Sequence, residues 1–341
     1  MSHKNSTALL NKVAEFDNLV RAFHECSRFK RSSRGYQEAL FGIGERLKLI
    51  ENELKSGTFK WKGYRSFYVH DPKKRLIMCA PFMDRVVHHA IHRLVEPTID
   101  PLMSDSVFAC RKKRGNRRAA VALWKVLEKF GPNRFTMKLD VSNYFQSINH
   151  NILLNQFLSC LPDPSIDDLL FNLLKSQPEF SKLGTGIPIG NLTSQLFANF
   201  YLITADRLAT KALGLDYYWQ QKKIEITDVF YIRYMDDLVL VGKNKRTVLD
   251  AVESLVYHIE QELKLSMAIN KRVPLGNAPV PFLGYLLNHD GYKILSRNKN
   301  RFKKKVKRLK TKKVRPSYMA MVEGSYQAWQ DLERGRDSRF V

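Results

Sequence analysis

The sequence is poor in cysteine, in long apolar segments and in acidic residues. Its four cysteines, Cys26, Cys79, Cys110 and Cys160, lie far apart without paired spacing, so neither a zinc cluster nor a disulfide framework is predicted. Free cysteine is usually buried, and we expect buried thiols and a reducing, cytoplasmic compartment. The chain has no apolar run of about 18 residues and no signal peptide at its start, so no membrane-spanning helix is predicted.

The shortage of acidic residues leaves a strongly basic chain. The sequence has 57 Lys+Arg against 33 Asp+Glu, a net charge of +24, which indicates a polyanionic partner. An anionic membrane would also attract such a chain, but the absence of an apolar segment favours nucleic acid. With 341 residues and 44% hydrophobic content, we expect one multilobed protein with a sizeable core.

Two adjacent aspartates separate two apolar segments. The stretch 231–243 reads as a strand, then Asp236 and Asp237, then a second strand. Two neighbouring carboxylates repel unless a cation or a proton lies between them, which favours a metal site. Aspartate is also common in hairpin turns, so the pair alone leaves a plain turn open.

A third aspartate ends another predicted strand. Residues 135–139 alternate between apolar and polar side chains and lead directly to Asp140. The carboxyl end of a strand is where α/β folds tend to place their chemistry. The chain between Asp140 and Asp236 is long enough for the two strands to lie side by side. Three carboxylates at one sheet edge would suit two divalent cations.

Four sequence blocks resemble, in order and spacing, the palm of a reverse transcriptase. They are Leu139-Asp140-Val141 with Tyr144-Phe145, Gly186-Ile187-Pro188-Ile189-Gly190-Asn191-Leu192-Thr193-Ser194-Gln195, Tyr234-Met235-Asp236-Asp237, and Phe282-Leu283-Gly284-Tyr285. The resemblance extends from about residue 65 to residue 290. It implies an α+β right-hand polymerase fold with fingers, palm and a short helical thumb. The implied activity is RNA-directed DNA synthesis from dNTPs on an RNA template with a DNA or RNA primer.

The second block indicates a subfamily. Most relatives have Gln where Ile189 stands and Pro where Gln195 stands, and the form found here is similar to the reverse transcriptases of diversity-generating retroelements. That resemblance implies a dedicated RNA template and a small basic accessory protein. Related antiphage enzymes, which copy a cognate structured noncoding RNA, are the alternative.

The resemblance also implies roles for the residues around the aspartates. Asp140 and Asp236, with the Val141 carbonyl, would hold two Mg²⁺ ions, and Asp237 would be an auxiliary ligand. Mg²⁺ prefers oxygen ligands and keeps water or phosphate in its other positions. Phe145 matches the aromatic steric gate that selects deoxynucleotides, although a buried core ring is the alternative.

Further residues are implied in substrate binding. Arg75, with Lys74 or Lys73, matches the basic residues that grip the triphosphate, for which arginine's forked donors are suited; a generally basic loop is the alternative. Lys271 stands where relatives often place a lysine near the leaving pyrophosphate.

The glycine-rich block is expected to contact template and incoming base. Glycine at 186 and 190 would let the backbone approach them closely, and Ile189, Gly190 and Gln195 are the predicted substrate contacts. Because Ile189 replaces an amide with a shape-only contact, we expect looser discrimination at some template bases, adenine in particular.

Helical periodicity completes the expected organisation. It predicts helices over 81–95, 119–130 and 246–263. His88 and His89 point in different directions on the first of these helices, which favours packing or RNA contact over metal binding. The expected lobes are an N-terminal helical extension (1–63), fingers (64–134), palm (135–150 and 184–290), a helical insertion between the palm segments (151–183) and a basic helical thumb (291–341).

The thumb segment is the most biased part of the chain. Between Arg297 and Arg315, twelve of nineteen residues are Lys or Arg and none is acidic. Phe302, Val306 and Leu309 recur at helical spacing, which predicts a helix with one basic face and one apolar stripe. A disordered basic tail is the alternative, because blocks of like charge often stay unfolded.

Overall fold

The chain forms two compact units, each assembled from separate stretches of sequence. The computed structural model describes residues 8–333, apart from 29, 71–73, 162, 213–228, 312–313 and 315. The first unit comprises Met1–Ser104, Val141–Asp206 and Tyr257–Ser266, and the second comprises Asp105–Asp140, Arg207–Val256 and Met267–Val341.

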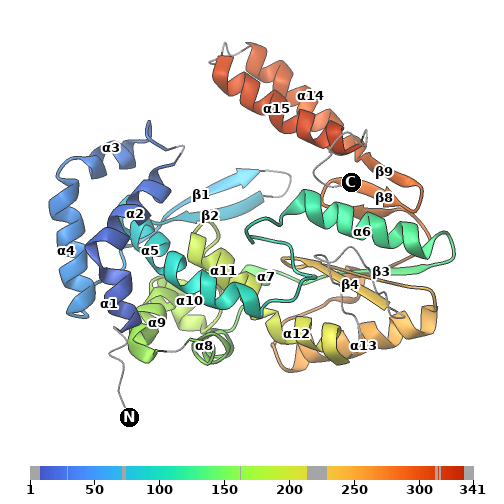
Figure 1. Ribbon diagram of the computed structural model, residues 1–341, viewed down its shortest axis with the longest axis horizontal. Coiled ribbons are helices and arrows are strands. Elements are labelled where there is room, and N and C mark those ends of the chain that lie inside the picture. The colour runs from blue at the N-terminus through green and yellow to red at the C-terminus, as the bar shows by residue number, and fades with distance from the viewer. Residues whose placement is uncertain are drawn as a thin grey trace. The chain divides into compact units, whose positions relative to one another are not determined.

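The first unit is mainly helical (Figure 1). Its helices are α1 (Leu9–Ala14), α2 (Phe16–Ser27), α3 (Arg34–Leu40), α4 (Ile43–Lys55), α5 (Phe82–Ile99), α7 (Tyr144–Ser147), α8 (His150–Leu158), α9 (Asp167–Lys175), α10 (Pro178–Leu183) and α11 (Leu192–Tyr201). Strands β1 (Arg65–His70) and β2 (Lys74–Cys79) form an antiparallel hairpin.

Helix α5 is central to this unit because it packs against both α2 and α11. Val86, Val87 and Ala90 are completely buried on it. His88 is buried as well, with its Nδ1 2.7 Å from Thr193 Oγ1 and its ring 4.8 Å from that of Trp61. Burial lowers the pKa of His88 to about 3, so this histidine has the packing role that the sequence favoured.

The second unit contains two antiparallel sheets. The larger has the order β4-β5-β3-β6 and the smaller has the order β7-β8-β9. Their strands are β3 (Phe135–Asp140), β4 (Val229–Tyr234), β5 (Asp237–Gly242), β6 (Arg272–Gly276), β7 (Val280–Phe282), β8 (Tyr285–Asn288) and β9 (Gly291–Ile294).

Helix α6 (Asn116–Phe130) packs against strands of both sheets (Figure 1). Leu123 and Val126 belong to one buried cluster with Phe230 of β4, Val239 of β5 and Leu287 of β8. Val, Ile and Phe are common in strands whose face is covered by a helix, because these side chains pack well on a half-buried pleated surface. The apolar face of α6 thus determines that it belongs with the sheets of the second unit.

The boundaries of the two compact units differ from those of the expected lobes. The expected fingers segment (64–134) includes residues 116–130, and in the structure α6 packs with the strands that carry the aspartates. The helix also begins before residue 119, because Gly115 adopts φ 107 and Asn116 accepts a hydrogen bond from the Arg117 backbone N–H. The polar first turn carries no apolar periodicity, so the sequence pattern missed it.

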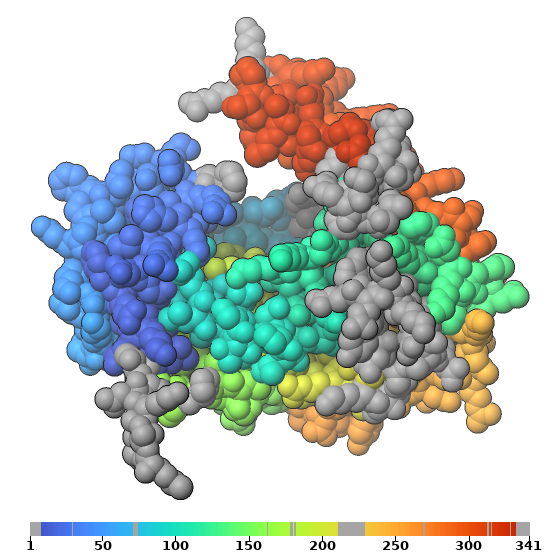
Figure 2. Space-filling model, in the orientation of Figure 1, coloured from blue at the N-terminus to red at the C-terminus, as the bar shows by residue number. Residues whose placement is uncertain are grey.

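Two pairs of helices complete the chain. Helices α12 (Ile203–Arg207) and α13 (Lys245–Gln261) each cross a boundary between the units, and α13 confirms the helix predicted over 246–263. Helices α14 (Ser296–Thr311) and α15 (Pro316–Glu333) pack together (Figure 2). Phe302 stacks on Tyr326 at 3.8 Å and Leu309 is buried. The apolar stripe is therefore confirmed, and the alternative of a disordered tail is wrong for 296–311.

All four cysteines are free thiols. Cys26 is buried as expected, but Cys110 is exposed and Cys79 and Cys160 are half-buried, so the expectation of burial was wrong for three of them. Cys110 lies in a loop with φ 51, directly after the buried residues 107–109. Within the part of the chain that the structure describes, no helix is long and apolar enough to cross a membrane.

Candidate active site

The two adjacent aspartates lie at a tight hairpin between β4 and β5. Tyr234 pairs with Asp237, so Met235 and Asp236 form the two-residue turn. Met235 adopts φ 57, a conformation uncommon for residues other than glycine. The fully buried Arg233 donates from Nη1 to the Met235 carbonyl at 2.9 Å. A buried cation thus holds the turn in an unusual conformation, as is common at functional sites.

Strand register brings the third aspartate to this turn. Strands β3 and β5 are antiparallel neighbours, and Asp140 is directly opposite Asp237. Directly opposed residues have their Cβ atoms about 5 Å apart. The sequence prediction that Asp140 lies beside the aspartate pair is therefore confirmed, while the role of these residues as metal ligands stays a prediction.

Two lysines contact the carboxylates. Lys138 Nζ lies 2.7 Å from Asp237 Oδ2, and Lys271 Nζ contacts Asp140 Oδ2. Burial raises the pKa of Asp237 to about 6; Lys138 opposes this rise, and the charges of Asp140 and Asp236 add to it. Lys271 therefore lies beside the aspartates, and its role near the leaving pyrophosphate stays a prediction.

The cluster of three aspartates fits a divalent cation through its oxygen ligands, one of which is unsatisfied. Asp237 Oδ1 is buried and has no hydrogen-bond partner, and such an atom is costly unless something compensates it. Over the described ranges, no three His, Cys, Asp or Glu side chains are already gathered as metal ligands; two of the carboxylates contact lysines instead. The three carboxylates supply the oxygen ligands that a divalent cation such as Mg²⁺ prefers.

The segment after Asp140 belongs to the first unit. Val141 is buried, and Asn143 adopts φ 45 before the short helix α7. Phe145 is half-buried, with its ring 5.8 Å from that of Tyr144. Its carbonyl accepts a hydrogen bond from the Ile187 N–H at 2.8 Å. The predicted gate residue is therefore tied to the glycine-rich block.

The glycine-rich block is packed against its neighbours in the first unit. A Cβ at Gly190, which has φ +124, would lie 2.9 Å from Ile77 Cγ2, and one at Gly186, with φ +97, would lie 2.8 Å from the Phe180 ring. The Ile189 carbonyl also accepts from the Met78 N–H at 2.8 Å. Close packing therefore requires glycine at both positions, a reason that the sequence did not reveal.

The other predicted substrate contacts lie on accessible parts of the first unit. Ile189 is half-buried and Gln195 is exposed. Lys74 and Arg75 are exposed at the start of β2, and Lys74 Nζ lies 4.1 Å from the Tyr68 ring centre. Lys73 lies outside the described residues. Exposed cations on a hairpin can reach a phosphate without first losing buried partners.

The Phe282–Tyr285 block also forms a tight turn. Leu283 and Gly284 both have positive φ, and Asn298 Nδ2 donates to the Gly284 carbonyl at 3.1 Å. A Cβ at Gly284 would collide with the Trp329 ring, which also stacks on Tyr285. Helices α14 and α15 are thereby attached to this turn.

Sequence reasoning missed Lys138, which contacts both Asp237 and the Pro281 carbonyl, the latter at 2.9 Å. One signal was available: Lys138 precedes Asp140 by two positions, and alternate residues of a strand share a face. Its partner Pro281 could not be found this way, since it lies far along the chain.

Comparison with known proteins supports the resemblance. Residues 69–287 match the family described as reverse transcriptase (RNA-dependent DNA polymerase). The group II intron-encoded protein LtrA of Lactococcus lactis subsp. cremoris is 22% identical over 298 residues, which cover 71% of this chain and 49% of LtrA. Protein YkfC of Escherichia coli is 25% identical, with 71% of each chain covered. The yeast putative COX1/OXI3 intron 1 protein is 25% identical, and the match covers 20% of its length.

A solved structure has a similar fold. Apo telomerase from Candida tropicalis has a TM-score of 0.51 at 10% identity, with 69% of this chain and 49% of telomerase covered. The predicted α+β polymerase fold is confirmed, and the family match includes all four sequence blocks. The chain therefore belongs to the reverse transcriptase family.

Proposed function

We propose that this chain is an RNA-directed DNA polymerase that makes cDNA by two-metal nucleotidyl transfer. The observation that carries the proposal is the pairing of Asp140 with Asp237 beside the Asp236 turn. The buried and unpartnered Asp237 Oδ1 supports it, because this oxygen calls for a cation. Family membership supports the reaction class.

Asp140, Asp236 and Asp237, together with the Val141 carbonyl, would hold two Mg²⁺ ions. When bound, these ions make the primer 3′-hydroxyl more acidic and stabilise the pyrophosphate that leaves. The Lys271 ammonium contacts Asp140 and would release it to hold a proton near the departing pyrophosphate. The unusual backbone at Met235 keeps Asp236 at the tip of the turn.

The first unit would bind the incoming nucleotide. Arg75 and Lys74 would hold the triphosphate through charge-assisted hydrogen bonds. The Phe145 ring would lie under the sugar and exclude a 2′-hydroxyl. Ile189, Gly190 and Gln195 would contact the nascent base pair.

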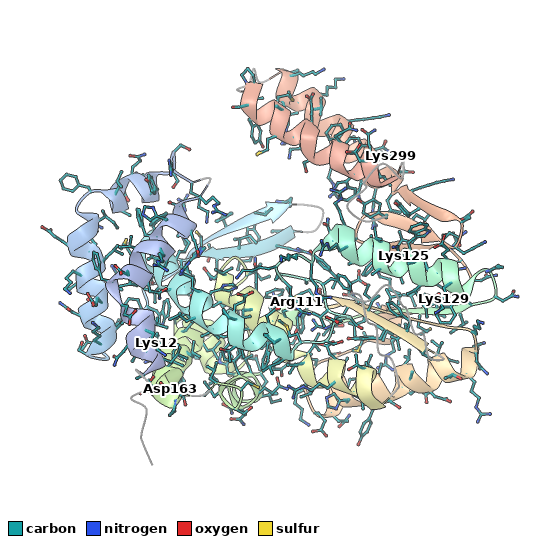
Figure 3. All side chains as sticks on the ribbon, in the orientation of Figure 1. Lys12, Arg111, Lys125, Lys129, Asp163 and Lys299 are labelled. Carbon is teal, nitrogen blue, oxygen red and sulfur yellow. The ribbon has the colours of Figure 1, made fainter. Side chains whose placement is uncertain are left out.

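The basic helices would bind the backbone of the template and primer. Lys299 lies on α14, and Lys125 and Lys129 lie four residues apart on α6 (Figure 3). Helix α14 has no acidic residue in its first turn and ends with Arg308 and Lys310. Such a surface binds phosphates without reading sequence.

The experiment that tests the activity is primer extension on an RNA template. We expect the wild-type chain to extend an annealed DNA primer with dNTPs in Mg²⁺ and to make no product when EDTA is added. RNA binding measured in parallel separates a catalytic defect from a binding defect. Binding without extension, in either Mg²⁺ or Mn²⁺, would contradict the proposal.

We further propose that the enzyme is of the diversity-generating-retroelement type and copies a dedicated RNA with a small accessory protein. The Ile189 and Gln195 positions support this type by sequence similarity alone. An antiphage reverse transcriptase that copies a cognate noncoding RNA is the alternative. Sequencing the cDNA distinguishes them: errors several-fold more frequent at template adenines are expected for the first type, and evenly distributed errors favour the second.

A further inference from the structure

Lys138 joins three segments of the second unit. From β3 it reaches Asp237 Oδ2 at 2.7 Å and the Pro281 carbonyl at 2.9 Å. Its ammonium also lies 5.5 Å from the centre of the Phe282 ring. The side chain is only 22% exposed, so these contacts are shielded from water and stronger than they would be on the surface.

Lys138 is more firmly anchored than the other lysine at the carboxylates. Lys271 follows a short turn and contacts Asp140 Oδ2, and its side chain is 32% exposed. An ammonium has three donors. Lys138 directs two of them at oxygens on different strands, since Asp237 begins β5 and Pro281 belongs to β7. Lys138 therefore acts as a fixed bridge between these strands.

One partner of Lys138 lies on the strand that precedes the turn contacted by the C-terminal helices. Strand β7 continues directly into the Leu283–Gly284 turn, which Asn298 and Trp329 contact. Asp237 begins the strand that follows the Met235–Asp236 turn. Lys138 thus hydrogen-bonds to a strand that adjoins each of these two turns.

We propose that Lys138 is a positioning residue for nucleotidyl transfer, which fixes Asp237 against β7 and balances one of the three carboxylate charges. This inference rests on the proposed function. The ammonium reduces the attraction of the carboxylates for a divalent cation, yet it holds Asp237 in the geometry that the reaction requires. Loss of its charge should therefore strengthen Mg²⁺ binding and slow the reaction at the same time.

The experiment compares Lys138→Met, which keeps the apolar stem, with Lys138→Arg, which keeps the charge. Lys245→Met is the matched control, because Lys245 lies in the same unit, 5.7 Å from the ring of Phe135, at the opposite end of β3 from Asp140. Mg²⁺ binding is measured by thermal shift without nucleic acid or dNTP, at about pH 8.5, well above the usual pKa of a carboxyl. Primer extension gives kcat and the KM for dNTP.

For Lys138→Met we expect kcat to fall about 10- to 100-fold with KM little changed, as for a misplaced catalytic group. The Mg²⁺ concentration that gives half of the maximal thermal shift, the Mg²⁺ midpoint, should fall about three- to tenfold, because a nearby positive charge has been removed. Lys138→Arg should restore the midpoint and most of kcat, and Lys245→Met should match wild type. If Lys138→Met does not fold, Lys138→Gln gives the same test.

An unchanged or raised Mg²⁺ midpoint in Lys138→Met would overturn the proposal, as would equal effects of Lys138→Met and Lys245→Met on kcat. A different result is expected if the proposed function itself is wrong. In that case wild type itself makes no DNA on an RNA template, while the Mg²⁺ titration still reports whether Lys138 balances the carboxylates.

Discussion

The aspartate turn and the glycine-rich block are held in place by different kinds of interaction. Strand register and ion pairs position Asp140, Asp236 and Asp237 in the second unit. In the first unit, Gly186 and Gly190 are fixed by close contact with Phe180 and β2. The aspartate turn brings together the charged side chains that the proposed reaction requires. The glycine-rich block creates a shaped backbone surface, so changes there should alter stability and selectivity before they alter the chemical step.

The largest effect on stability is expected at the glycine-rich block. Gly190→Ala forces a Cβ into Ile77 and into a backbone conformation with φ +124, and we expect a loss of about 3 kcal/mol in the free energy of unfolding. Gly44→Ala is the control, because Gly44 lies in α4 with nothing within 4 Å of its Cβ position. That change should be neutral or stabilise by up to about 1 kcal/mol. Denaturant unfolding measures both, and equal stabilities would contradict the packing argument.

His88 makes the stability of the first unit depend on pH. Its pKa is lowered to about 3 by burial, below the usual value of about 6.5 in an unfolded chain. The unfolded state therefore takes up a proton first, and stability falls as pH drops from about 6.5 towards 3. Between pH 7 and pH 5 we expect wild type to lose about 2 kcal/mol more than His88→Gln. Denaturant unfolding at each pH measures both proteins, and identical slopes for wild type and His88→Gln would refute the argument.

Phe145 tests whether the first unit selects the sugar. Phe145→Ala should raise ribonucleotide incorporation relative to deoxynucleotide by about 10- to 100-fold, because a steric exclusion of this kind is worth one to a few kcal/mol. Competing ribo- and deoxynucleotides in primer extension measure the ratio. Phe171→Ala, at a partly exposed ring on α9, provides the comparison. No rise in ribonucleotide use would favour a plain packing role for Phe145.

The smallest expected effect is on fidelity. Ile189→Gln restores the amide that most relatives carry, and we expect misincorporation at template adenine to fall by a few-fold, since one hydrogen bond contributes about 1 kcal/mol. Sequencing of cDNA made on a defined RNA gives the error at each base. An unchanged error spectrum would remove Ile189 as a determinant of selectivity.

Local patterns in the sequence were enough to predict the aspartate turn. Alternating residues indicated β3, apolar segments indicated β4 and β5, and the aspartates ended or separated these strands. The same reasoning could not find why Gly190 is glycine, because its neighbour Ile77 lies on β2, far away along the chain. Nor could it find that Trp329 covers Gly284. Contacts between residues distant along the chain depend on packing, which leaves no periodic signal.

The assignment of α6 shows the same limit. Its helical pattern was visible, but which sheet it covers depends on the matching apolar residues of β4, β5 and β8. Its packing places α6 in the second unit, while its assignment to the fingers stays a prediction.

The most direct test of the account is Asp236→Asn, which keeps the size of the side chain and removes its charge. Primer extension on RNA should fall by at least about a thousandfold, because a metal-dependent step loses a ligand, while RNA affinity stays within about twofold of wild type. Asp250→Asn, on the exposed face of α13, should retain full activity. An Asp236→Asn enzyme that extends primers as fast as wild type would contradict the assignment of these aspartates to catalysis.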